Sequence, residues 1–100
     1  MIRKRGRERI LYLPHAARQM TRPDRMISTP EIRRVIDEGE IIEDYPDDVR
    51  GRSCLILGKG DADRPLHVVC TPKDEYLAII TAYVPTRENW EEGFMVRRKK

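Results

Sequence analysis

Residues 28–45 read STPEIRRVIDEGEIIEDY, and they carry the signals of a helix followed by a strand. Ser28 and Glu31 have the spacing of a capping box, so a helix is predicted to begin there. It is expected to run through Asp37 and to stop at Gly39, because glycine commonly follows the last turn of a helix. The apolar residues of this helix recur with the spacing of one helical face: Ile32, Val35 and Ile36.

After Gly39 the sequence changes to the patterns of β-strands. Runs rich in β-branched and aromatic residues follow one another, separated by short segments of turn-forming residues. Strands that are connected so closely are expected to pair antiparallel. The predicted strands cover residues 40–45, 53–57, 66–71 and 76–84.

Before residue 28 the sequence predicts a second, shorter helix. Pro14 suits the first turn of a helix that runs from about His15 to Met20. The apolar run at residues 10–13 fits either an edge strand or the lead-in to this helix. Together these patterns predict an α+β domain in which two N-terminal helices pack on a four-stranded antiparallel sheet. The helices are expected to cover one face of the sheet and to leave the other face for function.

The length of 100 residues fits one domain. We expect the folded domain to span residues 9–96, between a basic, disordered N-terminus (residues 1–8) and a basic tail (residues 97–100). The formal net charge of +3 agrees with an anionic partner such as RNA, although the basic ends are also explained as solvated tails.

The apolar runs of the chain are far shorter than the roughly 18 residues that a membrane helix needs. The basic N-terminus is not followed by the apolar segment of a secretory signal, so we expect a cytoplasmic protein with no membrane partner. Cys54 and Cys70 each lie in an apolar, strand-like run, which favours buried free thiols over a disulfide.

Few side chains offer acid–base chemistry, since His15 and His67 are the only histidines. Neither has a neighbour at metal-ligand spacing and no glycine-rich phosphate loop occurs, so no metal or other cofactor is expected. His15 and Arg18 are three residues apart and share a helix face, where a proton-transfer group and a cation can meet one phosphate. The alternative is that His15 bonds a local carbonyl and Arg18 pairs with an acid such as Glu43.

The predicted strands carry the remaining candidates, His67, Thr81 and Tyr83. If Ala78, Ile80, Ala82 and Val84 pack under the helices, these three candidates share the open face of the sheet. The alternative is a half-buried structural histidine beside ordinary strand residues. Metal-independent RNA cleavage needs a base, an acid and cations around one phosphate. The candidate residues would be sufficient for RNA cleavage if they lie around one phosphate.

A series of short motifs in a fixed order connects this chain to a known family. Together they resemble the family called domain of unknown function 4258, over about residues 10–98. The motifs are His15-Ala16-x-Arg18-x-Met20, Ser28-x-x-Glu31-Ile32, Gly39-Glu40-Ile41-Ile42-Glu43-Asp44-Tyr45-Pro46, Cys54-Leu55-x-Leu57-Gly58, Arg64-Pro65-Leu66-His67-Val68-Val69, Thr81-Ala82-Tyr83-x-Pro85 and Trp90. One departure is the segment at residues 22–26, where the family commonly has an Arg-Gly-Ile type of turn.

The resemblance implies a place among the barnase-like and RelE-like ribonuclease toxins, whose active site lies on the exposed face of a four-stranded antiparallel sheet. It also implies a protein partner of the small zinc-ribbon antitoxin type. We therefore expect a metal-independent, ribonuclease-like toxin domain that acts on or binds RNA. The alternatives are a catalytically silent module that binds such an antitoxin, and a structural core with incidental histidines. The positions that match the family motifs and could carry chemistry are His15, Arg18, His67, Thr81 and Tyr83.

Overall fold

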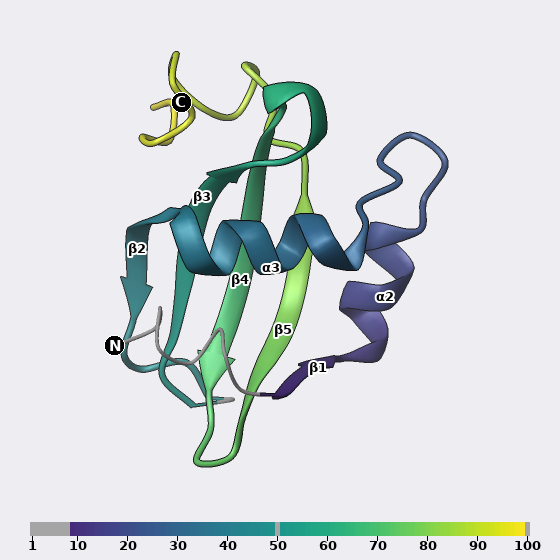
Figure 1. Cartoon of the computed structure of the whole chain (residues 1–100). Coiled ribbons are helices and arrows are strands. Elements are labelled where there is room, and N and C mark those ends of the chain that lie inside the picture. Colours follow the sequence, from purple (N-terminus) through teal and green to yellow (C-terminus); the bar gives the residue numbers. More distant parts are fainter. Residues whose placement is uncertain (1–8, 50, 100) are drawn as a thin grey trace.

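A computed structural model describes residues 9–49 and 51–99 of the chain. Figure 1 shows α3 (Thr29–Glu38) lying across one face of the sheet, with α2 (Pro14–Met20) at the side where β1 (Arg9–Tyr12) and β5 (Tyr76–Tyr83) lie. The predicted disordered N-terminus, residues 1–8, lies outside the described residues. The elements follow in the order β1 (Arg9–Tyr12), α2 (Pro14–Met20), α3 (Thr29–Glu38), β2 (Glu40–Tyr45), β3 (Ser53–Lys59), the 3₁₀ turn η1 (Asp61–Asp63), β4 (Pro65–Pro72) and β5 (Tyr76–Tyr83).

The sheet corrects the predicted topology, although the α+β class and the two helices are confirmed. Five strands lie in the order β1-β5-β4-β3-β2, and the sheet is mixed because β1 pairs parallel with β5. The prediction of a four-stranded antiparallel sheet that follows both helices is therefore wrong. The physical reason is that β1 has only four residues, which is too few to show a strand pattern. It pairs with a strand more than 60 residues later in the sequence, with Arg9 opposite Tyr76.

Helix α3 begins and ends as its sequence indicates. The Ser28 hydroxyl accepts a hydrogen bond from the Glu31 amide at 3.3 Å, and the Glu31 carboxylate accepts one from the Ser28 amide at 3.0 Å. At the other end, a side-chain carbon on Gly39 would lie 2.5 Å from the Val35 carbonyl oxygen and 2.7 Å from that of Leu57. Gly39 thus allows the end of α3 to meet β3 at a distance that a larger residue would prevent.

The core lies between the helices and one face of the sheet. The β4 residues Val68 and Cys70 point into it, and by alternation His67 points to the opposite face. The pairing of β4 with β5 shifts between Val69 and Cys70, so the alternation along β5 is interrupted there. The buried residues of this core are Ala16, Met20, Ile27, Ile32, Val35, Ile36, Cys54, Ile56, Leu66, Val68, Cys70, Leu77, Ile79 and Ala82.

The opposite face of the sheet is covered where His67 on β4 and Tyr83 on β5 lie side by side. The C-terminal segment, residues 85–99, packs there. Trp90 and Arg97 form an isolated antiparallel bridge in this segment, and Trp90 is 3% exposed. Its ring contacts His67. The predicted basic tail therefore begins with residues that belong to a packed segment.

Cys54 and Cys70 are both free and buried, which confirms the prediction. Neither helix in residues 9–49 and 51–99 has the length and apolar character needed to span a membrane.

Candidate functional site

The centre of the candidate site is the contact between His67 on β4 and Tyr83 on β5. The two residues are directly opposite in the antiparallel ladder, and Nδ1 of His67 lies 3.2 Å from the Tyr83 hydroxyl oxygen. Nε2 of His67 lies 2.8 Å from the Phe94 carbonyl oxygen. A carbonyl only accepts, so Nε2 carries the hydrogen, and Nδ1 accepts the hydrogen bond that the Tyr83 hydroxyl donates.

Burial keeps both members of this pair neutral. His67 has no exposed surface, and this burial lowers its pKa, although the Phe94 carbonyl and the Glu43 charge oppose the shift. Burial also raises the pKa of Tyr83. The pair is therefore a neutral imidazole with a protonated phenol, and Tyr83 remains a donor at neutral pH.

Trp90 and Arg97 cover the histidine. The Trp90 ring meets the His67 ring edge to face, with 4.4 Å between the ring centroids and an interplanar angle of 84°. The guanidinium carbon of Arg97 lies 4.7 Å from the centroid of the Trp90 ring, which is a cation–π contact. His67 is thus shielded from direct contact with a substrate.

Arg97 is held in place by Glu43 on β2. Two nitrogens of its guanidinium, Nε and an Nη, donate to the Glu43 carboxylate at 2.9 and 3.0 Å, and the Tyr45 hydroxyl donates to the same carboxylate. Burial would raise the pKa of Glu43, but the hydrogen bonds from Arg97 and Tyr45 outweigh it and lower the pKa. The bidentate pair ties the C-terminal segment to the edge strand of the sheet.

A pocket of about 340 Å³ opens beside this cluster. Of the described residues that line it, two are arginines and none is acidic. Nε of Arg98 donates to the Arg87 carbonyl, while Nη1 lies 3.5 Å from the Glu91 carboxylate. The pocket therefore offers a phenol and two guanidinium groups to an anion. Its lining residues are Tyr83, Asn89, Trp90, Arg97 and Arg98.

A second pocket, of about 500 Å³, is less suited to an anion. It lies where the end of α3 approaches the C-terminal segment, and three acidic residues outnumber its one lysine, Lys59. The remaining lining residues are uncharged.

The structure brings some of the predicted site residues together and separates others. His67 and Tyr83 are in contact, and Thr81 lies partly exposed on the same strand as Tyr83, opposite Val69. His15 and Arg18 are exposed on α2, whose buried residues belong to the core on the other side of the sheet from His67. They lie apart from the pocket, and Glu43 pairs with Arg97 rather than with Arg18.

The sequence places Arg97 and Arg98 in a basic tail, where they can add charge toward RNA, but it does not predict that they line a pocket with Tyr83. The available signal was Trp90, an aromatic residue seven positions before Arg97 that had to be buried somewhere.

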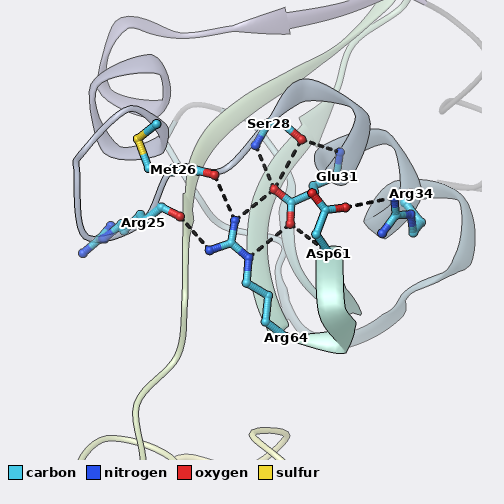
Figure 2. A network of polar contacts seen from close by, with 7 residues as sticks. All are labelled: Arg25, Met26, Ser28, Glu31, Arg34, Asp61 and Arg64. Carbon is cyan, nitrogen blue, oxygen red and sulfur yellow. Dashed lines mark hydrogen bonds and ion pairs between the residues drawn. The ribbon is translucent and has the colours of Figure 1, made fainter.

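A second polar cluster, shown in Figure 2, has a structural role. The Arg64 guanidinium donates to both oxygens of the Glu31 carboxylate and to the carbonyls of Arg25 and Met26. Burial would raise the pKa of Glu31, but hydrogen bonds from Arg64, Ser28 and Asp61 hold it at about 2. This cluster joins the start of α3 to the turn before β4, and Glu31 is only 1% exposed.

Among the described residues, no three histidine, cysteine, aspartate or glutamate side chains gather where they could hold a metal ion. The family model described as Domain of unknown function (DUF4258) matches residues 12–84. No curated protein matches the chain, and no solved structure does.

Proposed function

We propose that this chain, which belongs to the family described as Domain of unknown function (DUF4258), is an RNA-binding domain of the metal-independent ribonuclease type. The observation that supports the proposal is the pocket beside β5, where Tyr83, hydrogen-bonded to His67, lies with Arg97 and Arg98. RNA cleavage without a metal requires a base, an acid and cations around one phosphate. The pocket would supply the base and the cations, and solvent the acid. A place among the barnase-like and RelE-like toxins, which the family resemblance implies, would favour the same substrate.

Arg98 is the residue that we expect to bind a phosphate. Its pair with Glu91 is long, 3.5 Å, and the two side chains are 41% and 49% exposed. Exposed ion pairs contribute only about 0–1 kcal/mol, so a phosphate can replace this carboxylate at little cost. Arg97 adds positive charge to the pocket, but its bidentate bond to Glu43 keeps it in position.

Tyr83 is the residue that we expect to contact the ribose. Its hydrogen is directed at His67, so its oxygen can accept a proton from the 2′-hydroxyl. In the proposed reaction Tyr83 takes that proton while its own passes to Nδ1 of His67. The 2′-oxygen attacks phosphorus, the bond to the 5′-oxygen breaks, and solvent protonates the leaving oxygen. Because burial lowers the pKa of His67, the Tyr83–His67 pair is a weak base. We therefore expect the domain to bind RNA tightly but to cleave it slowly.

His15, Arg18 and Thr81 have supporting roles in this proposal. Thr81 would add a hydroxyl donor next to Tyr83 on β5. His15 and Arg18 would contact a second phosphate, because both are exposed on α2 and stand one helical turn apart. If His15→Ala or Arg18→Gln weakens RNA binding, and Arg98→Gln still weakens it further in the same protein, then His15 and Arg18 contact this second phosphate.

Binding of a fluorescently labelled, mixed-sequence RNA tests the pocket. Arg98→Gln should weaken binding roughly 10-fold, the effect of one charged hydrogen bond. The matched control is Arg22→Gln, because Arg22 is another exposed arginine in a loose pair, 3.4 Å from Asp24. Equal binding by wild type and Arg98→Gln, or equal losses in both variants, would remove the pocket from the RNA site.

A catalytically silent protein-binding module is the second candidate, and one observation favours it. Met95 and Val96 are apolar yet 42% and 62% exposed, directly before Arg97. A partner of the zinc-ribbon antitoxin type could cover them and the pocket together. In co-expression with such a protein, Val96→Asp should abolish the complex. A complex that survives this substitution would exclude this surface as the interface.

A further inference from the structure

Cys54 on β3 and Cys70 on β4 face each other inside the core. They are directly opposite in the antiparallel ladder, and their sulfur atoms lie 3.9 Å apart. Both are free, and their exposed fractions are 6% for Cys54 and 0% for Cys70. The RNA site proposed above uses neither residue, so the inference drawn from this pair is independent of it.

The ladder itself allows a bond between the two residues. Opposite residues in antiparallel strands have Cα atoms about 4.5 or 5.5 Å apart, depending on their place in the hydrogen-bond pattern. Both separations fall within the range of about 4.4–6.8 Å that disulfides span. The sulfur atoms must approach by about 2 Å to reach bonding distance, which a rotation of the side chains supplies.

We propose that Cys54 and Cys70 are a reversible oxidation site that a small peroxide converts into an intramolecular disulfide. Two sulfurs that face each other across adjacent strands set this pair apart from ordinary buried cysteines. A small oxidant is required because so little of either residue is exposed. Hydrogen peroxide satisfies this requirement, whereas bulky thiol reagents do not.

Cys54 is the sulfur that reacts first. The hydrogen bond between Cys54 and Cys70 lowers the pKa of Cys54, and Arg52 acts in the same direction, while burial and Asp44 oppose them. The same hydrogen bond, together with burial, raises the pKa of Cys70. Cys54 is also the less buried of the two and lies one strand from the sheet edge, opposite Asp44 on β2.

The chemistry balances in two steps. The Cys54 thiolate attacks one oxygen of hydrogen peroxide, the O–O bond breaks, and Cys54 becomes a sulfenic acid as hydroxide leaves. The Cys70 sulfur then attacks the Cys54 sulfur and loses its proton. The S–O bond breaks, the S–S bond forms, and water leaves. Two thiols are oxidised by two electrons, and one peroxide is reduced to two waters.

Intact mass under non-reducing conditions tests the proposal on the full chain. Treatment of the folded, reduced protein with hydrogen peroxide should give a monomer lighter by two hydrogen atoms, and dithiothreitol should restore the original mass. Peptide mapping should then find the Cys54 and Cys70 peptides joined. Added oxygen on the Cys54 or Cys70 peptide as the main product, disulfide-linked dimers, or no bond between Cys54 and Cys70 under conditions that oxidise the denatured chain would each overturn the proposal. Oxygen added to the exposed methionines, Met26 and Met95, is assigned separately in the same peptide map.

Two single substitutions resolve the order of the steps. Cys70→Ser should leave a sulfenic acid on Cys54, which dimedone traps when the oxidised protein is unfolded in its presence. Cys54→Ser should react with peroxide at its remaining thiol at least roughly 10-fold more slowly, because that thiol is fully buried. Equal rates of oxidation in the two variants would contradict the role of Cys54. Should either variant fail to fold, the peptide map of the wild type still decides whether the disulfide forms.

Discussion

The Tyr83 hydroxyl donates a hydrogen bond to Nδ1 of His67 across 3.2 Å, and the imidazole that accepts it has no surface exposed to solvent. A histidine in this environment is neutral because burial lowers its pKa. It orients Tyr83 toward a pocket that also contains arginine side chains. This relationship has consequences for stability as well as for the proposed activity.

The stability of the fold should decrease as the pH falls through the ordinary pKa of histidine, about 6.5. The pKa of His67 is lowered in the folded state, so below that pH the unfolded chain binds a proton that the folded chain resists. Urea unfolding between about pH 8 and about pH 5 measures the effect. His67→Gln should flatten the decrease, and His15→Gln should retain it because His67 is still present. A decrease of the same size in the His67→Gln protein would show that other groups cause it.

The carboxylate of Glu31 should be among the strongest side-chain contributions to stability. Glu31→Gln removes the charge that Arg64 and the Asp61 amide surround, which should cost about 3 kcal/mol of unfolding free energy. The matched control is Asp61→Asn. The Asp61 side chain is 72% exposed and lies 3.4 Å from Arg34, so its substitution should change stability little. Equal losses in the two variants would contradict the assigned role of Glu31.

The same carboxylate predicts an acid transition with a definite sign. The pKa of Glu31 is lowered to about 2 in the folded state, so its contribution is present above the unfolded value of about 4.3 and is lost as the pH falls toward about 2. Glu31→Gln should lack this component of the acid denaturation curve. An unchanged curve would mean that other carboxylates account for the transition.

The C-terminal segment should loosen when its ion pair is broken. Trp90 is the only tryptophan, so its fluorescence reports on this segment alone. Arg97→Ala removes both the bond to Glu43 and the cation–π contact, and the emission should shift to longer wavelength and be quenched more readily by acrylamide. Lys59→Ala, on β3, serves as a control. Identical quenching in wild type and Arg97→Ala would show that the ion pair does not hold the segment.

How much the sequence predicts depends on the range of the interactions. The cap and apolar stripe of α3 are local, and the structure confirms both. The parallel pairing of β1 with β5 is not local, because the residues of Arg9–Tyr12 alternate too briefly to reveal a partner beyond residue 75. The shift in the pairing of β4 with β5 beside Val69 is likewise not indicated by any pattern in the sequence. Because of this shift Ile79 lies in the helix-side core, whereas unbroken alternation from Ala82 predicts Ala78 and Ile80 there.

The candidate site was predictable only in part for the same reason. That His67, Thr81 and Tyr83 share one face follows from strand alternation near the ends of β4 and β5. That Arg97 lies over Trp90 depends on how the last residues fold back, and a run of basic residues does not indicate it. The separation of His15 and Arg18 from His67 depends on which face of the sheet α2 covers.

RNA affinity should depend steeply on salt. Arginine contacts to phosphates release counterions, so the logarithm of the association constant should fall linearly with the logarithm of the salt concentration. Arg98→Gln should reduce the slope by about 0.7, the value for one phosphate of a single strand. Anisotropy titrations at several salt concentrations give the slope, and Arg22→Gln is again the control. A slope unchanged by Arg98→Gln would place the phosphate contacts elsewhere.

Cleavage of a mixed-sequence RNA in the presence of EDTA, by wild type and by Tyr83→Phe, decides whether the Tyr83–His67 pair supports metal-independent catalysis. Each protein must first be freed of any bound partner by denaturation and refolding, with the fold checked by Trp90 fluorescence. We expect the wild type to produce fragments with 2′,3′-cyclic phosphate ends. Tyr83→Phe, which lacks the hydroxyl that donates to His67, should cleave more slowly by a factor on the order of 100 with similar RNA affinity. RNA left intact by the wild type over long incubation, or cleaved equally fast by Tyr83→Phe, would contradict the proposed role of Tyr83.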